Sequence, residues 1–286
     1  MYDRVLLGVD GSQCATTAAR VGLALAAATG AAVDVVSAVT ETDDPTRERA
    51  DRDRARAALD EVGELSATVG VPVETHVREG RPADALATTA AERSADLVVV
   101  GRTGTGGVGR RLLGSVTDRL LRTVDRDVLV VPDDLVLGDG WAADTVLAPT
   151  DGSEAAERAA APAAGVADAL GATLAVLGVV DLQAEAGMFS AGGVSEEFVE
   201  HQEARRREDV EAFLAAARRT AAPTTRTAVR RGRPHEEIAA HAEAVGAGLV
   251  VMASRGESTF AGQLLGSVTD RVIRLAGVPV LVVPVR

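Results

Sequence analysis

The sequence contains no lysine, so its 30 basic residues are all arginine. This absence excludes a phosphate-binding P-loop that ends in Gly-Lys-Ser/Thr, and it excludes chemistry through a Schiff-base lysine. The single cysteine, Cys14, has no partner for a disulfide within this sequence. Aromatic residues make up only 2% of the sequence, which leaves few rings on which single-stranded nucleic acid could stack.

Excess positive charge and long apolar runs are also absent. The net charge of −12 is the opposite of what a nucleic-acid-binding surface needs, so we expect no nucleic-acid partner. The most apolar windows, residues 21–28 and 174–180, are far shorter than the roughly 20 residues that span a bilayer, so no membrane partner is expected. The N-terminal residues MYDRVLLGVD lack the charged-then-apolar pattern of a secretory signal. These features predict a cytoplasmic protein.

The chain contains an internal duplication. Residues 98–116, VVVGRTGTGGVGRRLLGSV, return in altered form at residues 250–268, and LLGSVTDR is identical at 112–119 and 264–271. A length of 286 residues fits two domains. We predict a first domain at residues 1–133, a linker at 134–143 and a second domain at 144–286. The second copy has an insertion near residues 183–194, for which a lid and a surface loop without a ligand role are both open interpretations.

Short Val-, Leu- and Ile-rich runs alternate with longer stretches of helical spacing in both copies. The predicted strands are residues 4–9, 32–39, 71–78, 96–101 and 128–131, then 145–148, 173–180, 225–230, 249–253 and 279–283. The alternation predicts an α/β fold with two tandem doubly wound parallel five-stranded sheets, Rossmann-like, with helices on both faces. With the strand order 3-2-1-4-5, ligands would bind where the order reverses, between strands one and four.

The segment after the fourth strand is a candidate phosphate-binding loop. It has the spacing Gly101-x2-Gly104-x9-Gly114-Ser115 and ends at the start of a helix. Glycines let main-chain N–H groups approach an anion, and a helix N-terminus adds unpaired donors and the positive end of its dipole. We expect Asp10, which follows the first strand, to line the same crevice. The alternative interpretation is a flexible turn with a serine helix cap.

These motifs together resemble the universal stress protein family, in particular its members with two tandem domains. The resemblance covers essentially the whole chain and rests on four sets of residues. They are Val9-Asp10-Gly11-Ser12 and Pro149-Thr150-Asp151-Gly152-Ser153 after the first strands, Gly80-x-Pro82 and Gly232-x-Pro234 after the third strands, Ala95-Asp96-Leu97 before a fourth strand, and the G-x2-G-x9-G-S segment. The resemblance implies an adenine nucleotide alpha hydrolase-like fold, ATP binding and a regulatory role in the stress response.

The resemblance also implies which residues bind the nucleotide, which would be ATP, AMP or ADP, with or without magnesium. In the ATP-binding branch of that family, the first-strand aspartate and the glycine segment hold the nucleotide, and a valine that ends strand two contacts the adenine. The candidates in the first copy are Val9, Asp10, Val39, Gly101, Arg102, Gly104, Gly114, Ser115 and Val116. Those in the second copy are Pro149, Asp151, Val179, Ala253, Gly256, Gly266, Ser267 and Val268.

The two predicted sites differ. Ala253 replaces the glycine at position 101 and lacks the freedom of glycine at positive φ. Gly262 and Gln263 replace Arg110 and Arg111, which with Arg102 would offset the charge of a nucleotide in the first copy. We therefore expect the first site to bind ATP more tightly than the second.

The remaining residues predict little chemistry. No general base pairs with Asp10, so we expect no enzyme beyond a slow ATPase, and no catalytic residue is assigned. The four histidines show no metal-ligand spacing with Cys14, and the charged run at residues 43–56 is interpreted as a solvated helix face. The apolar last strands suggest an intramolecular pseudo-dimer that could itself form a homodimer. The alternative function is a nucleotide-independent scaffold with an unoccupied pocket.

Overall fold

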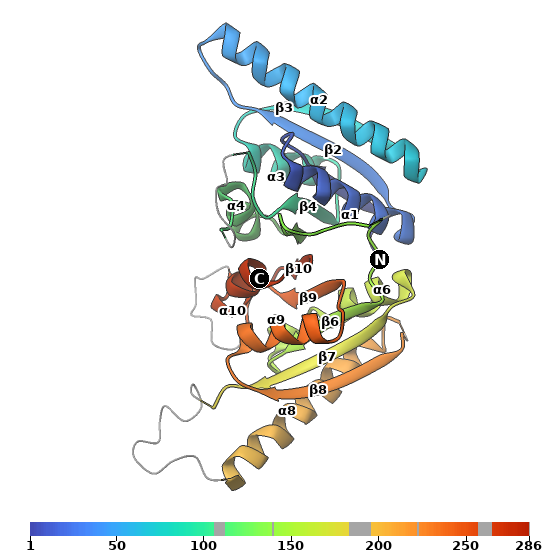
Figure 1. The fold of residues 1–286 in the computed structure, drawn as a ribbon, viewed down its shortest axis with the longest axis vertical. Coiled ribbons are helices and arrows are strands. Elements are labelled where there is room, and N and C mark those ends of the chain that lie inside the picture. Colours follow the sequence, from blue (N-terminus) through green and yellow to red (C-terminus); the bar gives the residue numbers. More distant parts are fainter. Residues whose placement is uncertain (106–111, 139, 183–195, 222, 257–264, 286) are drawn as a thin grey trace. The chain divides into compact units, whose positions relative to one another are not determined.

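The computed structural model describes residues 1–105, 112–138, 140–182, 196–221, 223–256 and 265–285 (Figure 1). The chain divides into two compact units, Met1–Ala142 and Ala143–Arg286. The first unit therefore includes most of the segment that the sequence predicts as a linker. None of the helices within these described ranges has both the length and the apolar character that crossing a bilayer requires.

The first unit alternates strands and helices in the predicted order. Its elements are β1 (Arg4–Gly8), α1 (Gln13–Thr29), β2 (Ala32–Val39), α2 (Pro45–Val69), β3 (Val73–Glu79), α3 (Pro82–Glu92), β4 (Leu97–Gly101), α4 (Ser115–Thr123) and β5 (Asp127–Val131). The helices α1 and α2 contact each other, as do α3 and α4, because the two pairs cover opposite faces of the sheet.

The second unit repeats this order. Its elements are β6 (Thr145–Thr150), α5 (Glu154–Glu157), α6 (Ala160–Leu170), β7 (Thr173–Val180), α8 (Glu196–Ala217), β8 (Thr225–Arg231), α9 (Pro234–Ala244), β9 (Leu249–Ala253), α10 (Ser267–Leu275) and β10 (Val280–Val283).

The strand order of each unit confirms the predicted doubly wound topology. The strands lie in the order β3-β2-β1-β4-β5 in the first unit and β8-β7-β6-β9-β10 in the second. Every described pair within a unit is parallel, and Val5 of β1, for example, is paired with Val33 of β2 and Leu97 of β4. The order reverses beside β1 and beside β6, which is where ligands bind in open parallel sheets.

Aliphatic side chains and small residues form the core of the first unit. Leu6 and Leu7 of β1 and Leu97 of β4 are at most 1% exposed. Gly22 lets α1 approach this strand closely, because a Cβ at that position would lie 2.4 Å from Leu7 Cδ2. Gly30 ends α1 with φ of 73°, a left-handed conformation that returns the chain directly to the sheet.

The first helix of the second unit is divided, unlike its counterpart α1. The helix α5 ends at Glu157, and α6 begins at Ala160. Pro162 has no N–H to donate to the carbonyl of Arg158, four residues earlier. Because proline is tolerated only in the first turn of a helix, the break falls just before it.

A partly buried carboxyl group begins β5. Asp127 Oδ2 accepts a hydrogen bond of 2.6 Å from the Tyr2 hydroxyl. Burial raises the pKa of Asp127 to about 6, the nearby charge of Asp96 adds to this effect, and the hydrogen bond from Tyr2 opposes it. Burial and the charge of Asp127 also raise the pKa of Tyr2 well above its ordinary value.

Asp127 makes stability depend on pH in a predictable direction. Its folded-state pKa exceeds the ordinary aspartate value of 3.8, so the folded protein holds this proton more strongly than the unfolded chain. The contribution of this proton to the stability of the folded protein is therefore fully present below about pH 4 and is lost as the pH rises through about 6. Since one pKa unit corresponds to about 1.4 kcal/mol, the loss amounts to at most about 3 kcal/mol.

We expect Asp127→Asn to remove this loss. Urea unfolding at several pH values between 4 and 7 should show that the variant gains stability relative to the wild type as the pH rises. Comparing the two proteins cancels the titration of the other carboxyl groups, including that of Asp34, whose lowered pKa acts in the opposite direction. A difference between them that is constant over this range would show that Asp127 titrates normally.

Candidate functional site

A cavity of about 960 Å³ lies at the carboxyl ends of β1, β2 and β4 in the first unit. It is bordered by the chain segments that follow these strands and by the first turn of α4. Its lining residues include Val9, Asp10, Ala38, Thr40, Gly101, Gly104, Gly114, Ser115, Val116 and Thr117. The cavity therefore lies beside β1, where the strand order reverses.

The side chain of Asp10 joins the loops after β1 and β4. Its Oδ1 accepts a hydrogen bond of 3.0 Å from the N–H of Ser12, and its Oδ2 accepts one of 3.0 Å from the N–H of Thr105. A Cβ at Gly104 would lie 2.5 Å from Asp10 Oδ2, so a side chain at that position would displace the carboxylate. Residues about 90 positions apart thus meet in one crevice, as the predicted topology requires.

The second unit repeats this contact. Asp151 Oδ1 accepts hydrogen bonds from the N–H and hydroxyl of Ser153, at 3.1 and 2.6 Å. A Cβ at Gly256 would lie 2.1 Å from Asp151 Oδ2. The aspartate and glycine that recur in the sequence are therefore a steric pair in both units.

The start of α4 is fixed to the end of β4 by two hydrogen bonds. The N–H of Gly114 donates to the carbonyl of Arg102 at 2.8 Å, and the Thr117 hydroxyl donates to the carbonyl of Gly101 at 2.8 Å. The same bonds fix α10, from Gly266 to Ser254 at 2.7 Å and from Thr269 to Ala253 at 3.0 Å. The two buried threonines lie within the recurring LLGSVTDR sequence, yet sequence reasoning did not identify their role.

The first turn of α4 presents uncapped donors to the cavity. Gly114 is the N-cap, with φ of −65° and ψ of 147°, and no side chain caps this end. Ser115 is exposed and is the first helical residue, so it is not the cap that the alternative interpretation of the sequence assumed. The main-chain N–H groups of Ser115, Val116 and Thr117 belong to the first turn, where a helix supplies no internal acceptors.

Two of the first-copy candidates, Val39 and Arg102, are not among the residues that line the cavity. Val39 is only 2% exposed, and its neighbours Ala38 and Thr40 line the cavity instead. Arg102 is 2% exposed, and its guanidinium forms ion pairs with Asp133 and Asp134. The expectation that Arg102 offsets the charge of a nucleotide is therefore not supported. Arg110 and Arg111 lie outside the described residues.

Three charged residues of α2 line the cavity and were missed. Arg47, Asp51 and Arg54 lie on one helix face, and Arg54 Nη1 is 2.8 Å from Asp51 Oδ1. From the sequence alone, residues 43–56 are expected to form a solvated helix face. The signal that could have found these residues is their spacing of four and three, which places them on one side of the helix.

Ala253 does not disturb the second unit in the expected way. Gly101 is not among the residues with positive φ, so its replacement by alanine does not require an unusual backbone conformation. Glycine is needed there because a Cβ would lie 2.6 Å from Cys14 Sγ. Ala155 stands at the position of Cys14 in the second copy, and its smaller side chain leaves room for that of Ala253. Burial also raises the pKa of the Cys14 thiol.

The second-copy candidates lie at the equivalent element ends, with one change of correspondence. Gly80 donates its N–H to the carbonyl of Val39, and Gly232 donates to that of Val180. Val180 is therefore the counterpart of Val39, and Val179 is the counterpart of the cavity-lining Ala38. The other candidates are Pro149 at the end of β6, Asp151 after it, Ala253 at the end of β9, Gly256 after it, and Gly266, Ser267 and Val268 at the start of α10. Gly262 and Gln263 lie outside the described residues.

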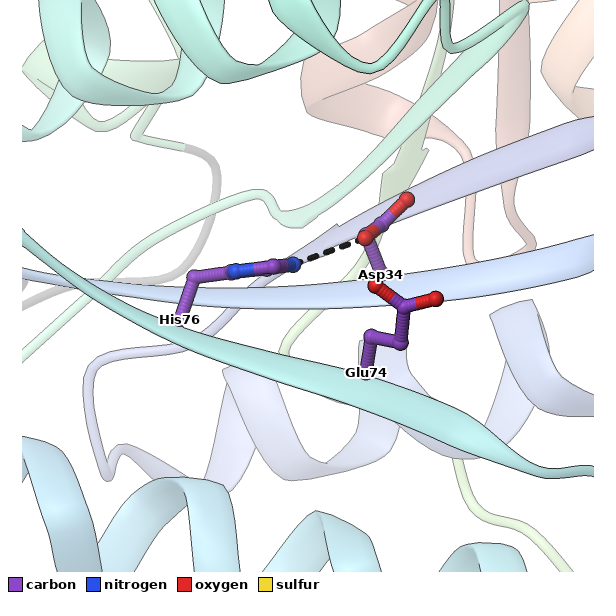
Figure 2. Close-up of side chains that lie close together, drawn as sticks. All are labelled: Asp34, Glu74 and His76. Carbon is purple, nitrogen blue, oxygen red and sulfur yellow. Dashed lines mark hydrogen bonds and ion pairs between the residues drawn. The ribbon is translucent and has the colours of Figure 1, made fainter.

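A separate cluster of charged residues lies within the sheet of the first unit. Figure 2 shows that His76 points toward Asp34, with Glu74 beside it; His76 Nε2 is 2.7 Å from Asp34 Oδ1. The three side chains lie close enough to share a metal ion. However, Arg4 Nη1 donates to Asp34 Oδ2 at 2.8 Å, and Arg93 forms ion pairs with both Asp34 and Glu74. The two guanidinium groups already supply the positive charge that a metal ion would bring.

Asp34 is fully buried, yet it stays ionised. Burial alone would raise its pKa, but hydrogen bonds from Arg4 and His76 and the charge of Arg93 lower the pKa below its ordinary value. The second unit has Ala175 at this position, paired with Leu147 just as Asp34 is paired with Leu6. The cluster is therefore a structural feature of the first unit alone.

The fold and cavity define a tandem α/β protein with a helix N-terminus at each switch point. A model of the universal stress protein family matches the chain twice, over residues 1–132 and 143–284. A universal stress protein of Mycolicibacterium smegmatis is 36% identical over 223 residues, which cover 77% of this chain and 71% of that protein. One of Thermus aquaticus is 38% identical over 136 residues, which cover 46% of this chain and 99% of that protein.

A solved structure agrees with these matches at the level of the fold. The crystal structure of a universal stress protein from Archaeoglobus fulgidus superimposes with a TM-score of 0.67 and 22% sequence identity. The match covers 98% of this chain and 97% of that one. The chain belongs to the universal stress protein family and contains two of its domains in tandem.

Gly104→Ala tests the contact that joins the two loops. The added Cβ would displace the Asp10 carboxylate and break its bond to Thr105, so we expect a loss of about 1.5 to 3 kcal/mol in urea unfolding. Gly63→Ala is the matched control, because Gly63 lies within α2 with nothing near its Cβ position and should gain up to about 1 kcal/mol. Equal stability of Gly104→Ala and the wild type would contradict the steric pairing.

Asp34→Ala tests the buried cluster. Removing the shared acceptor of Arg4, His76 and Arg93 should destabilise the first unit by about 3 kcal/mol, the low end for a broken buried pair, because these partners are partly exposed. Hydrogen exchange of the β1 and β2 amides measures this unit separately. Glu92→Ala breaks an exposed pair with Arg78 and should cost less than about 1 kcal/mol. Similar losses in the two variants would show that the cluster contributes no more than a surface pair.

Proposed function

We propose that the first unit binds ATP, or another adenine nucleotide, in the cavity beside β1, and that binding regulates the protein in the stress response. The observation that carries this proposal is the uncapped N-terminus of α4, fixed by hydrogen bonds to the end of β4 and facing the cavity. A helix N-terminus of this kind stabilises a phosphate through its free N–H groups and its dipole. The family resemblance of the glycine segment supports the same ligand.

The phosphate groups would lie at the first turn of α4. The N–H groups of Ser115, Val116 and Thr117 and the Ser115 hydroxyl are the donors available there. Hydrogen bonds to a charged partner contribute roughly 1.5 to 3 kcal/mol each, so three or four approach the roughly 8 kcal/mol of micromolar affinity. Arg47 and Arg54 line the same cavity and oppose the repulsion from the net charge of −12, which salt screens over about 8 Å.

The nucleoside would lie toward the ends of β1 and β2. The cavity volume of about 960 Å³ is within the usual range for small-molecule sites, roughly 300 to 1,000 Å³. Asp10 is positioned there by its bonds to Ser12 and Thr105, and each of its oxygens retains a lone pair for a ribose hydroxyl or a magnesium ion.

We propose regulation rather than catalysis, with hydrolysis of ATP at most slow. Two carboxylates in the cavity lining have partners: Asp10 accepts two main-chain N–H groups, and Asp51 forms an ion pair with Arg54. A third lining carboxylate, Glu41, is exposed. Histidine is not among the described lining residues, and no described hydrogen bond fixes Glu41, so none of the described lining residues is a positioned general base for water.

We also propose that the first site is the stronger one. In the first unit, α2 contributes Arg47, Asp51 and Arg54 to the cavity, a formal charge of +1. The residues at the matching positions of α8 are Gln202, Arg206 and Asp209, a formal charge of 0. We therefore attribute the weaker binding of the second site to this difference in charge and not to Ala253.

Calorimetric titration of the full chain with ATP tests both ATP binding by the first unit and the greater affinity of the first site. Ser115→Asp places a carboxylate at the phosphate position while suiting the helix dipole, so it should weaken the tighter binding event at least tenfold without unfolding α4. Ser267→Asp is the matched change in the second unit and should leave that event unchanged. Equal effects of the two substitutions on the tighter binding event would contradict the proposed difference in affinity between the sites. Absence of any ATP binding, with or without magnesium, would favour the nucleotide-independent scaffold.

A further inference from the structure

The second helices of the two units align through their buried faces. Ala55, Ala58, Leu59 and Val62 are buried in α2, and the residues 155 positions later, Val210, Phe213, Leu214 and Ala217, are buried in α8. By the same offset, Asp51 corresponds to Arg206 and Arg54 to Asp209. The ion pair on the cavity side of α2 therefore recurs in α8 with its charges exchanged.

The side chain of Arg206 lies across the ends of two strands of the second unit. Its Nη1 donates to the main-chain carbonyl of Asp151, just after β6, and is 3.1 Å from Asp209 Oδ2. A Cβ at Gly178 would lie only 2.4 Å from Arg206 Cγ and 2.8 Å from its Cδ, so the apolar stem lies directly on β7. The Arg206 side chain is only 12% exposed.

The corresponding place in the first unit is open. The ends of β1 and β2 border the cavity there, and Asp51 and Arg54 line its side, with Arg54 60% exposed. Ser37 stands at the position of Gly178, as the pairing of Gly8 with Val36 and of Pro149 with Leu177 shows. A serine at position 178 would collide with Arg206. The changes at positions 178, 206 and 209 are thus mutually compatible, and together they place a guanidinium over the strand ends.

We propose that Arg206 is the residue that determines the ligand specificity of the second unit. Its side chain covers the ends of β6 and β7 and excludes the nucleoside part of an adenine nucleotide, and Asp209 holds it in place. The hydrogen bonds that fix the start of α10 are intact, so the exclusion acts at the nucleoside end of the crevice. The inference rests on the proposed function, because the second crevice is compared with a nucleotide site in the first.

The test is calorimetric titration of the full chain with ATP. The wild type should bind one ATP in the micromolar range, and Arg206→Ala should gain a second binding event at least tenfold tighter than any residual one in the wild type. Arg207→Ala is the control. Arg207 is the next residue of α8 after Arg206, its side chain is 60% exposed, and it forms an ion pair with Glu203. The double variant Arg206→Asp with Asp209→Arg restores the arrangement of the first unit and should also bind two ATP molecules. Because it keeps an ion pair between the two positions, it provides the test if Arg206→Ala folds poorly.

The outcomes separate this inference from the proposed function. Two equal ATP sites in the wild type, or a single site in both the wild type and the Arg206 variants, would overturn the role of Arg206 without refuting ATP binding by the first unit. A wild type that binds no ATP, with Arg206 variants that bind one, would refute the proposal for the first unit and support the exclusion. No binding by any of the proteins would refute both.

Discussion

A contact between the aspartate after the first strand and the glycine after the fourth organises the crevice of each unit. Asp10 Oδ2 binds the N–H of Thr105 and leaves no room for a Cβ at Gly104. Asp151 and Gly256 meet under the same constraint. This contact fixes the loop after the fourth strand at the switch point, and the bonds from Gly114 and Thr117 then fix the following helix. The orientation of that helix toward the cavity depends on both.

The fold and the position of the site could be predicted from the sequence because they follow from periodicity and topology. Alternating apolar runs and helical stretches define a doubly wound sheet, and its strand order brings the segments after strands one and four together. The duplication separates residues that recur, such as Asp10 and Gly104, from those that vary. The glycine of a steric contact recurs because no other residue fits, and this signal is present in a single sequence.

Side-chain direction and compensating changes could not be predicted in the same way. Arg102 follows a strand, and only the structure shows that its guanidinium is held by Asp133 and Asp134. The charged face of α2 depends on how the helix is rotated against the sheet. Ala253 is a departure from the motif when considered alone, but Ala155 stands where the first unit has Cys14, and its smaller side chain removes the reason for glycine. Each of these results depends on two residues that are distant in sequence.

The central claim is that the first turn of α4 holds the phosphate groups of an adenine nucleotide. The most direct measurement is the change in amide proton and nitrogen NMR resonances when ATP is added to the full chain. We expect the largest changes at the amides of Ser115, Val116 and Thr117, with smaller ones near Asp10. ATP-induced changes that leave these three amides unaffected would contradict it.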